Sequence, residues 1–423
     1  MVAFADYYCS SGPGHFTRFC PKFSSCSFYL HGFLSFMEEV KENKKRFKLV
    51  GLGKNLLLLL FTLVFIFVSL EIGIRFISPQ YRKIVHYDAV VGMTRIPSST
   101  FTYSRIADGQ RIKHPVNSDG FIGPDYLVQK GNNIFRIVIL GDSYTEGIQV
   151  DDKYAFRNLL ENKLREFSKK EIEVINLSMS GYSTAQEYLA LNKFGLKYQP
   201  DLVILVFNPL NDVSDNSFNL WGNSSKPFFE VREGKLNQIV WPKPFSKNYF
   251  FSLITDYFVS PRFIYDQYQQ AKASLRYQVE NSILEVDDSV YDVEYLKEWE
   301  EAWEITKYLI TATAEEAMNN SSKFLFVSIP DRSQVIAELK QNLINLKNNF
   351  GQKIDFEKPD NILEPFLTEN KISHLFMLTD FTNQADNQQL YLKGDGHFSE
   401  KGHQLAADLI YKYSIDNNLV PQE

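Results

Sequence analysis

The sequence predicts an α/β fold built around a parallel sheet and preceded by a helix that crosses a membrane. Three observations carry this prediction. Apolar strands alternate with amphipathic helices of about 10 to 15 residues from Ile134 onward, which is typical of βαβ units. An apolar run with the single polar residue Thr62 extends from Leu56 to Val68. Polar, glycine-containing clusters follow several of the predicted strands, where α/β proteins carry their chemistry.

Composition narrows the class of protein. The chain has 423 residues and a net charge of −6, and it lacks the clustered excess of Lys and Arg that a general nucleic-acid-binding protein uses. All three cysteines, Cys9, Cys20 and Cys26, lie near the N-terminus. Their spacing lacks the paired knuckle of a zinc site, even with His15 and His31 nearby, so we expect neither a metal site nor a disulfide framework there.

The N-terminal part predicts a single uncleaved membrane anchor. Six Lys and Arg residues at 41–54 precede the apolar run, and three follow it at Arg75, Arg82 and Lys83. This charge difference predicts residues 1–54 in the cytoplasm, residues 55–77 across the membrane and the remainder outside the cytoplasm. No small-residue cleavage pattern follows the run. A buried core helix is the alternative interpretation. The ordinary start "MEEVKENKKRFK" leads to the hypothesis that Met37 is the initiator and that residues 1–36 are not translated.

The outer part begins with an expected irregular lead-in, residues 78–133, because turn-rich stretches there show no sustained periodicity. The domain proper is expected to span 134–423. Its first half alternates strand and helix as strand Ile134–Leu140, helix Tyr154–Phe167, strand Ile172–Leu177, helix Thr184–Leu196 and strand Asp201–Phe207.

An aromatic-rich insertion at 214–292 interrupts this alternation, since Pro, Gly and Asn are frequent there. The pattern resumes with a helix from Val293 to Met318 and a strand from Lys323. Ser399 is expected to cap the final helix. The helix that follows the insertion places four apolar side chains on one face, which we interpret as core packing: Leu296, Trp299, Trp303 and Ile310.

Four short clusters contain the residues that acyl transfer needs. They are Gly141-Asp142-Ser143, Ser180-Gly181-Tyr182, Asn211-Asp212 and Asp395-Gly396-His397. The first three follow predicted strands and the fourth precedes the last helix. Because the carboxyl ends of parallel strands meet at one edge, we expect these clusters to lie together.

The residue types in these clusters match the parts of a serine-dependent reaction. Ser143 supplies a nucleophilic hydroxyl, His397 an imidazole base, and Asp395 a carboxylate that orients the imidazole. The backbone N–H groups of Ser143 and Gly181 and the amide of Asn211 are expected to form an oxyanion hole.

Neighbouring residues have more modest expected roles. Tyr144 and Glu146 follow the serine and are predicted to line the substrate pocket. Asp142 is expected to support the turn, Asp212 to be a loop or cap residue, and His403 to be a packed or exposed histidine of the final helix and not a ligand. No metal or cofactor is expected: the His-x5-His spacing does not place both rings on one helical face, and "GDSYTEG" lacks the dinucleotide-binding G-x-G-x-x-G.

The four clusters resemble the blocks of the SGNH hydrolases, also called GDSL lipases or esterases. The likeness covers about residues 115–415 and is carried by "GDSYTEG", "SGYST", "NPLND" and "DGHFSEKGH". The resemblance implies a three-layer α/β/α, flavodoxin-like fold and a membrane-anchored serine esterase or O-acyltransferase. It further implies a short-chain (acetyl) ester of a polysaccharide or other envelope component as the substrate.

The sequence departs from the family pattern at two positions. Pro209 stands where the third block usually has glycine, and Asp395 lies two residues before His397 in place of three. The closer spacing is similar to SGNH-like proteins that add or remove acetyl groups on polysaccharides. Pro209 favours the alternative, a non-catalytic envelope protein that binds carbohydrate or a partner. The sequence leaves the choice of acyl acceptor and the oligomeric state open.

Overall fold

The computed structural model describes residues 26–77, 84–105, 108–221, 226–239, 258–261, 263–264 and 287–422. The chain divides into two units, Met1–Leu70 and Glu71–Glu423. Cys9, Cys20 and His15 lie outside the described residues, as does much of the expected insertion.

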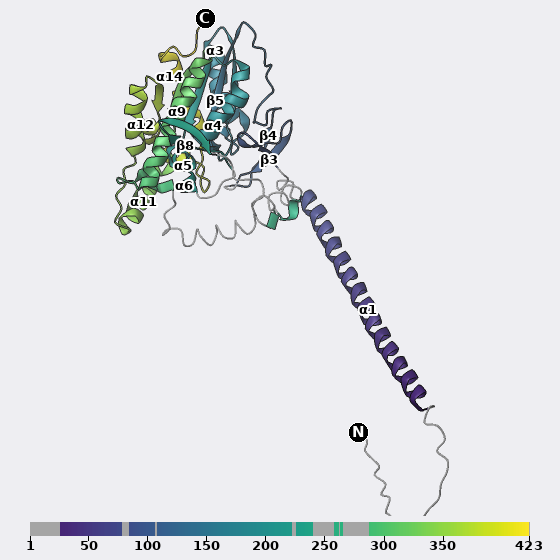
Figure 1. The fold of residues 1–423 in the computed structure, drawn as a ribbon. Coiled ribbons are helices and arrows are strands. Elements are labelled where there is room, and N and C mark those ends of the chain that lie inside the picture. Colours follow the sequence, from purple (N-terminus) through teal and green to yellow (C-terminus); the bar gives the residue numbers. More distant parts are fainter. Residues whose placement is uncertain are drawn as a thin grey trace, which may run out of the picture. The chain divides into compact units, whose positions relative to one another are not determined.

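The first long helix, α1 (Cys26–Ile77), contains the predicted anchor (Figure 1). Its part Leu52–Ile77 has the length and composition to cross a membrane, and only 6% of its most apolar window is buried. Glu71, near the end of α1, has hydrogen-bond partners outside the helix. Its carboxylate accepts hydrogen bonds from the backbone N–H groups of Val259 (2.8 Å) and Ser260 (2.9 Å).

Five parallel strands form the central sheet, which confirms the predicted sheet type. In spatial order they are β11 (Ser373–Phe376), β10 (Lys323–Ser328), β7 (Leu202–Phe207), β5 (Ile134–Leu140) and β6 (Glu171–Asn176). If the five strands are numbered in chain order and read from β6 to β11, this is the order 2-1-3-4-5 of flavodoxin-like sheets. The three central strands β10, β7 and β5 are almost entirely buried, and β7 is buried at every residue, as expected for a sheet covered on both faces, whereas the edge strand β11 is half-buried.

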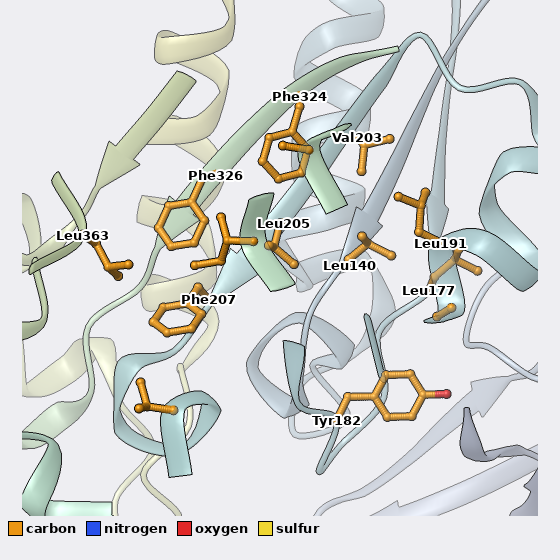
Figure 2. Close-up of a cluster of buried hydrophobic side chains, with 14 of the residues drawn as sticks. Leu140, Leu177, Tyr182, Leu191, Val203, Leu205, Phe207, Phe324, Phe326 and Leu363 are labelled. Atoms are coloured by element: carbon orange, nitrogen blue, oxygen red, sulfur yellow. The ribbon is translucent and has the colours of Figure 1, made fainter. Parts of the chain in front are cut away.

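Helices cover both faces and make three layers. One face packs on α3 (Phe156–Phe167) and α14 (Glu400–Asp416). The other packs on α4 (Thr184–Ala190), α9 (Lys297–Asn319) and α12 (Lys358–Glu369). Because strand side chains alternate, Leu140 and Leu205 enter the second core, as Figure 2 shows, whereas Ile139 enters the first.

Shorter elements connect these layers. After the first strands come α2 (Ser143–Glu146), η2 (Asp152–Tyr154), the π-turn η3 (Leu191–Gly195), η4 (Leu196–Tyr198), α5 (Pro209–Asp215) and α6 (Phe218–Trp221). The described parts of the insertion include a hairpin, β8 (Phe228–Arg232) with β9 (Lys235–Ile239), and η6 (Asp287–Tyr291). The C-terminal part adds α10 (Arg332–Val335), α11 (Ala337–Asn349), α13 (Leu378–Thr382) and η7 (Asn387–Leu390).

The lead-in is more regular than expected. It contains two antiparallel hairpins, β1 (Val85–Asp88) with β2 (Gly92–Arg95) and β3 (Thr100–Ser104) with β4 (Arg111–Pro115). Strands of four or five residues are too short to show a clear period in the sequence, which explains why this region reads as irregular.

The helix after the insertion begins later than expected. Trp299 and Trp303 are buried in the core, as predicted, with 3% and 4% of their surface exposed. Leu296 was expected on the same face, but it is the residue before the first turn of α9 and is 73% exposed. Ser399 caps α14 as expected, accepting from Gly402 N at 3.3 Å.

Candidate active site

The order of the strands locates the site. β5 lies between β6 and β7, so the connections leaving β5 and β7 turn in opposite directions at the carboxyl edge of the sheet. Such a switch point is where open α/β sheets bind their ligands. Ser143 follows β5 and Asn211 follows β7, so both residues lie at this point.

A tight turn presents Ser143. A Cβ atom on Gly141 would lie 2.2 Å from Thr145 Oγ1, so only glycine fits between the strand and α2. The Asp142 side chain caps α2 by accepting from the backbone N–H of Tyr144 at 2.9 Å. Ser143 is the first residue of α2 and is half-buried.

Ser143, His397 and Asp395 lie in line, although the serine and the histidine are 254 residues apart in the chain. His397 Nε2 is 2.8 Å from Ser143 Oγ, and His397 Nδ1 is 2.5 Å from Asp395 Oδ1. Burial alone would raise the pKa of Asp395, but the hydrogen bond and charge of His397 lower it below its usual value. This geometry lets the imidazole take the serine proton while the carboxylate stabilises the imidazolium.

The structure describes each of the three predicted oxyanion donors, and their convergence on one position stays a prediction. Among the described residues, the backbone N–H groups of Ser143 and Gly181 have no acceptor. Gly181 has a φ of +81°, which favours glycine. The amide Nδ2 of Asn211 lies 3.3 Å from Asp142 Oδ2, which places it beside the serine turn.

Pro209 does not displace Asn211. It occupies the first turn of α5, where its missing N–H is not needed, and Asn208 caps the helix by accepting from Leu210 N at 3.2 Å. Asp212 Oδ2 accepts from Asn208 N at 2.7 Å, which is the local capping role expected of it.

The two residues predicted to line the pocket are buried. Tyr144 is 6% exposed, and its hydroxyl donates to the carbonyl of Gly396 at 3.0 Å. Glu146 has no exposed surface. It accepts from Arg95 Nε and Nη2, both at 2.7 Å, and from the backbone N–H of Ser180 at 2.8 Å. These contacts hold both side chains in the protein interior. Their contact with substrate stays a prediction.

The structure adds two residues that sequence reasoning missed, Arg95 and Tyr103. Tyr103 OH donates to Asp395 Oδ2 at 3.1 Å. Arg95 lowers the pKa of Glu146 against the opposing effect of burial. Both residues belong to the lead-in, and their partners are 292 and 51 residues away, so no local signal in the sequence could have found them.

The remaining polar candidates are structural. His403 is 1% exposed, stacks on Phe156 with ring centroids 5.9 Å apart, and accepts from the Phe156 N–H at 3.3 Å. Burial lowers the pKa of His403 to about 3, so it is neutral. Burial raises the pKa of Asp142. Within the described part of the chain, no group of three His, Cys, Asp or Glu side chains is arranged to hold a metal.

No protein-family model matches the sequence, and neither does any curated protein. The chain is similar to the solved structure of a lipase/acylhydrolase from Enterococcus faecalis, with 14% identity, 68% of this chain and 99% of that chain covered, and a TM-score of 0.37. It is also similar to the acetyl xylan esterase AlAXEase, with 13% identity, 66% of this chain and 98% of that chain covered, and a TM-score of 0.35. A further similar structure is the psychrotrophic esterase EstA from Pseudoalteromonas sp., with 12% identity, 67% of this chain and 98% of that chain covered, and a TM-score of 0.34.

Proposed function

We propose that the protein is a serine esterase or O-acyltransferase of the SGNH type. The observation that carries this proposal is the hydrogen-bonded line from Ser143 Oγ through His397 to Asp395, with distances of 2.8 and 2.5 Å. The backbone N–H groups of Ser143 and Gly181, which have no acceptor in the part of the chain that the structure describes, and the Asn211 amide beside the serine turn support it.

The reaction proceeds in two steps. Ser143 Oγ attacks the acyl carbon while its proton passes to His397 Nε2, and the oxyanion accepts hydrogen bonds from the Ser143, Gly181 and Asn211 donors. The C–O bond to the alcohol breaks, and the alcohol leaves with the proton from His397. Water or a sugar hydroxyl then attacks the acyl-enzyme and gives its proton to His397. The bond between the acyl carbon and Ser143 Oγ breaks, Oγ regains the proton from His397, and either the acid or a new ester is released.

The location and the substrate that we propose for this reaction are supported by features of the sequence. The basic residues before the apolar segment support an extracytoplasmic catalytic domain held by one membrane helix. The resemblance to SGNH proteins that act on acetylated polysaccharides supports a short acyl group on an envelope polysaccharide. A fusion after Glu423 tests the topology. The reporter is an enzyme that folds only outside the cytoplasm, and we expect the fused reporter to be active.

Ester hydrolysis tests the chemistry. The full chain in detergent micelles is assayed with 4-nitrophenyl acetate and 4-nitrophenyl butyrate beside Ser143→Ala and His397→Ala. We expect activity in the unchanged protein, loss in both variants, and a higher rate with acetate. Sugar acceptors are assayed in parallel, since an acyltransferase excludes water. Equal rates in a folded protein and its two variants, with every acceptor, would instead support the carbohydrate-binding alternative.

A further inference from the structure

The lead-in segment Val85–Ser104 lies outside the five-stranded sheet, yet it contacts two loops of the candidate site. On one side, Arg95 binds Glu146, whose carboxylate also binds the N–H and hydroxyl of Ser180, next to Gly181. On the other side, Tyr103 from β3 binds Asp395. The segment therefore reaches both the expected oxyanion loop and the carboxylate behind the histidine.

The contact of Tyr103 completes the surroundings of Asp395. The Asp395 side chain is 4% exposed, and its two oxygens have different donors, His397 Nδ1 on Oδ1 and the Tyr103 hydroxyl on Oδ2. A buried carboxylate with one oxygen unpaired would be costly and free to rotate. Burial, together with the negative charge of Asp395, raises the pKa of Tyr103 far above its usual value. The hydroxyl therefore remains a donor throughout the neutral range.

We propose that Tyr103 is a positioning residue for the reaction. Its hydroxyl fixes the rotamer of Asp395 and reduces the negative charge that the Asp395 carboxylate presents to His397. This inference rests on the proposed function of Ser143. It makes the lead-in part of the active site: without Tyr103, the carboxylate becomes a stronger acceptor from His397 but loses its fixed orientation.

Other charged groups lie near Tyr103 and Asp395, and a useful substitution of Tyr103 must leave them unchanged. Arg105, at the end of β3, also acts electrostatically on Asp395, and it is itself paired with Asp108 and influenced by Glu400. Asp142 and the neutral His403 also interact electrostatically with His397. A Tyr103→Phe substitution changes none of these groups and removes only one hydroxyl.

The experiment measures the rate at which a fluorophosphonate modifies Ser143 as a function of pH, using the full chain in detergent micelles. This rate depends on deprotonation of His397 and needs no natural substrate. We expect Tyr103→Phe to react about tenfold more slowly, the loss of one charge-assisted hydrogen bond. We also expect its acid limb to move to higher pH, because an Asp395 carboxylate without the Tyr103 hydrogen bond stabilises the protonated imidazole more strongly.

Tyr126→Phe is the matched control. Tyr126 is also half-buried and donates to a backbone carbonyl, that of Val174, at 3.0 Å. A Tyr103→Phe profile that coincides with that of Tyr126→Phe overturns the inference while leaving the serine chemistry intact. A uniformly slower rate with an unmoved acid limb also overturns it, since that is what a purely structural role would produce. Absence of any Ser143 adduct in the unchanged protein overturns the proposed function together with this inference.

Discussion

The amide of Asn211 donates to Asp142 Oδ2 at 3.3 Å, so the residue that precedes Ser143 also holds one of the three proposed oxyanion donors. Removal of this amide in Asn211→Ala is expected to lower kcat for 4-nitrophenyl acetate about 10² to 10³-fold with little change in KM. Asn192→Ala removes an exposed amide bonded to the Tyr188 carbonyl and serves as the control. A kcat within a few-fold of the control would remove Asn211 from the oxyanion hole.

Gly181 offers a second test of the oxyanion loop. Its φ of +81° disfavours any side chain, and a Cβ would meet only Met93 Cε at 3.5 Å, so Gly181→Ala is strained mainly through its backbone. Gly351→Ala is the matched control, because Gly351 has a φ of +71° and open space around it, far along the chain at the end of α11. Both variants are expected to lose about 1 to 2 kcal/mol of stability. Only Gly181→Ala is expected to lose turnover as well, and equal turnover in the two variants would count against the role of the Gly181 N–H.

The ion pair of Arg95 and Glu146 is buried, with 4% and 0% of the two side chains exposed. Arg95→Met leaves the Glu146 carboxylate buried without its partner, and we expect a loss of about 3 to 5 kcal/mol in the free energy of unfolding. The double variant Arg95→Met with Glu146→Gln is expected to recover part of this loss, because Gln is neutral and still offers Ser180 an acceptor. Denaturant unfolding of the three proteins measures the difference. A double variant less stable than Arg95→Met would contradict the argument.

His403 predicts a pH dependence of stability. Its pKa is lowered from 6.5 to about 3 by burial, so the unfolded chain binds a proton more readily than the native protein does. Stability from this group is therefore complete above about pH 6.5 and is lost as the pH falls toward about 3, at about 1.4 kcal/mol per pH unit. His403→Gln removes the titration while keeping an acceptor for the Phe156 N–H. Thermal unfolding across this range is expected to show a shallower acid slope in the variant, and an unchanged slope would show that His403 does not contribute.

The sequence predicted the sheet well because buried parallel strands are continuous apolar runs. The strand Ile134–Leu140 has the predicted bounds, and the strand ending at Phe207 begins one residue later than predicted. It could not predict the hairpins of the lead-in, since their short strands have little periodicity and gain their stability from contacts with distant loops. The exposed Leu296 shows the same limit at a helix boundary, where an apolar residue continues the pattern beyond the helix itself.

The sequence predicted the site residues whose type alone indicates a role in the reaction. Ser143 follows β5, Asn211 follows β7, and Asp395 and His397 share the loop before α14. The structure brings Ser143, His397 and Asp395 into hydrogen-bond contact and places Asn211 beside the serine turn. Arg95 and Tyr103 were missed because an arginine or a tyrosine in a polar segment has no distinctive spacing, and its role depends on a partner far along the chain. Tyr144 and Glu146 were expected at the pocket from proximity alone, and their side chains turn inward.

The central claim is that Ser143 is the nucleophile activated by His397, and peptide mass spectrometry tests it most directly. The full chain is incubated with a fluorophosphonate, digested, and searched for the modified residue. The account predicts an adduct on Ser143, no adduct at that peptide in Ser143→Ala, and a rate reduced by orders of magnitude in His397→Ala. Modification of other residues at the same rate in all three proteins, with Ser143 unmodified, would contradict it.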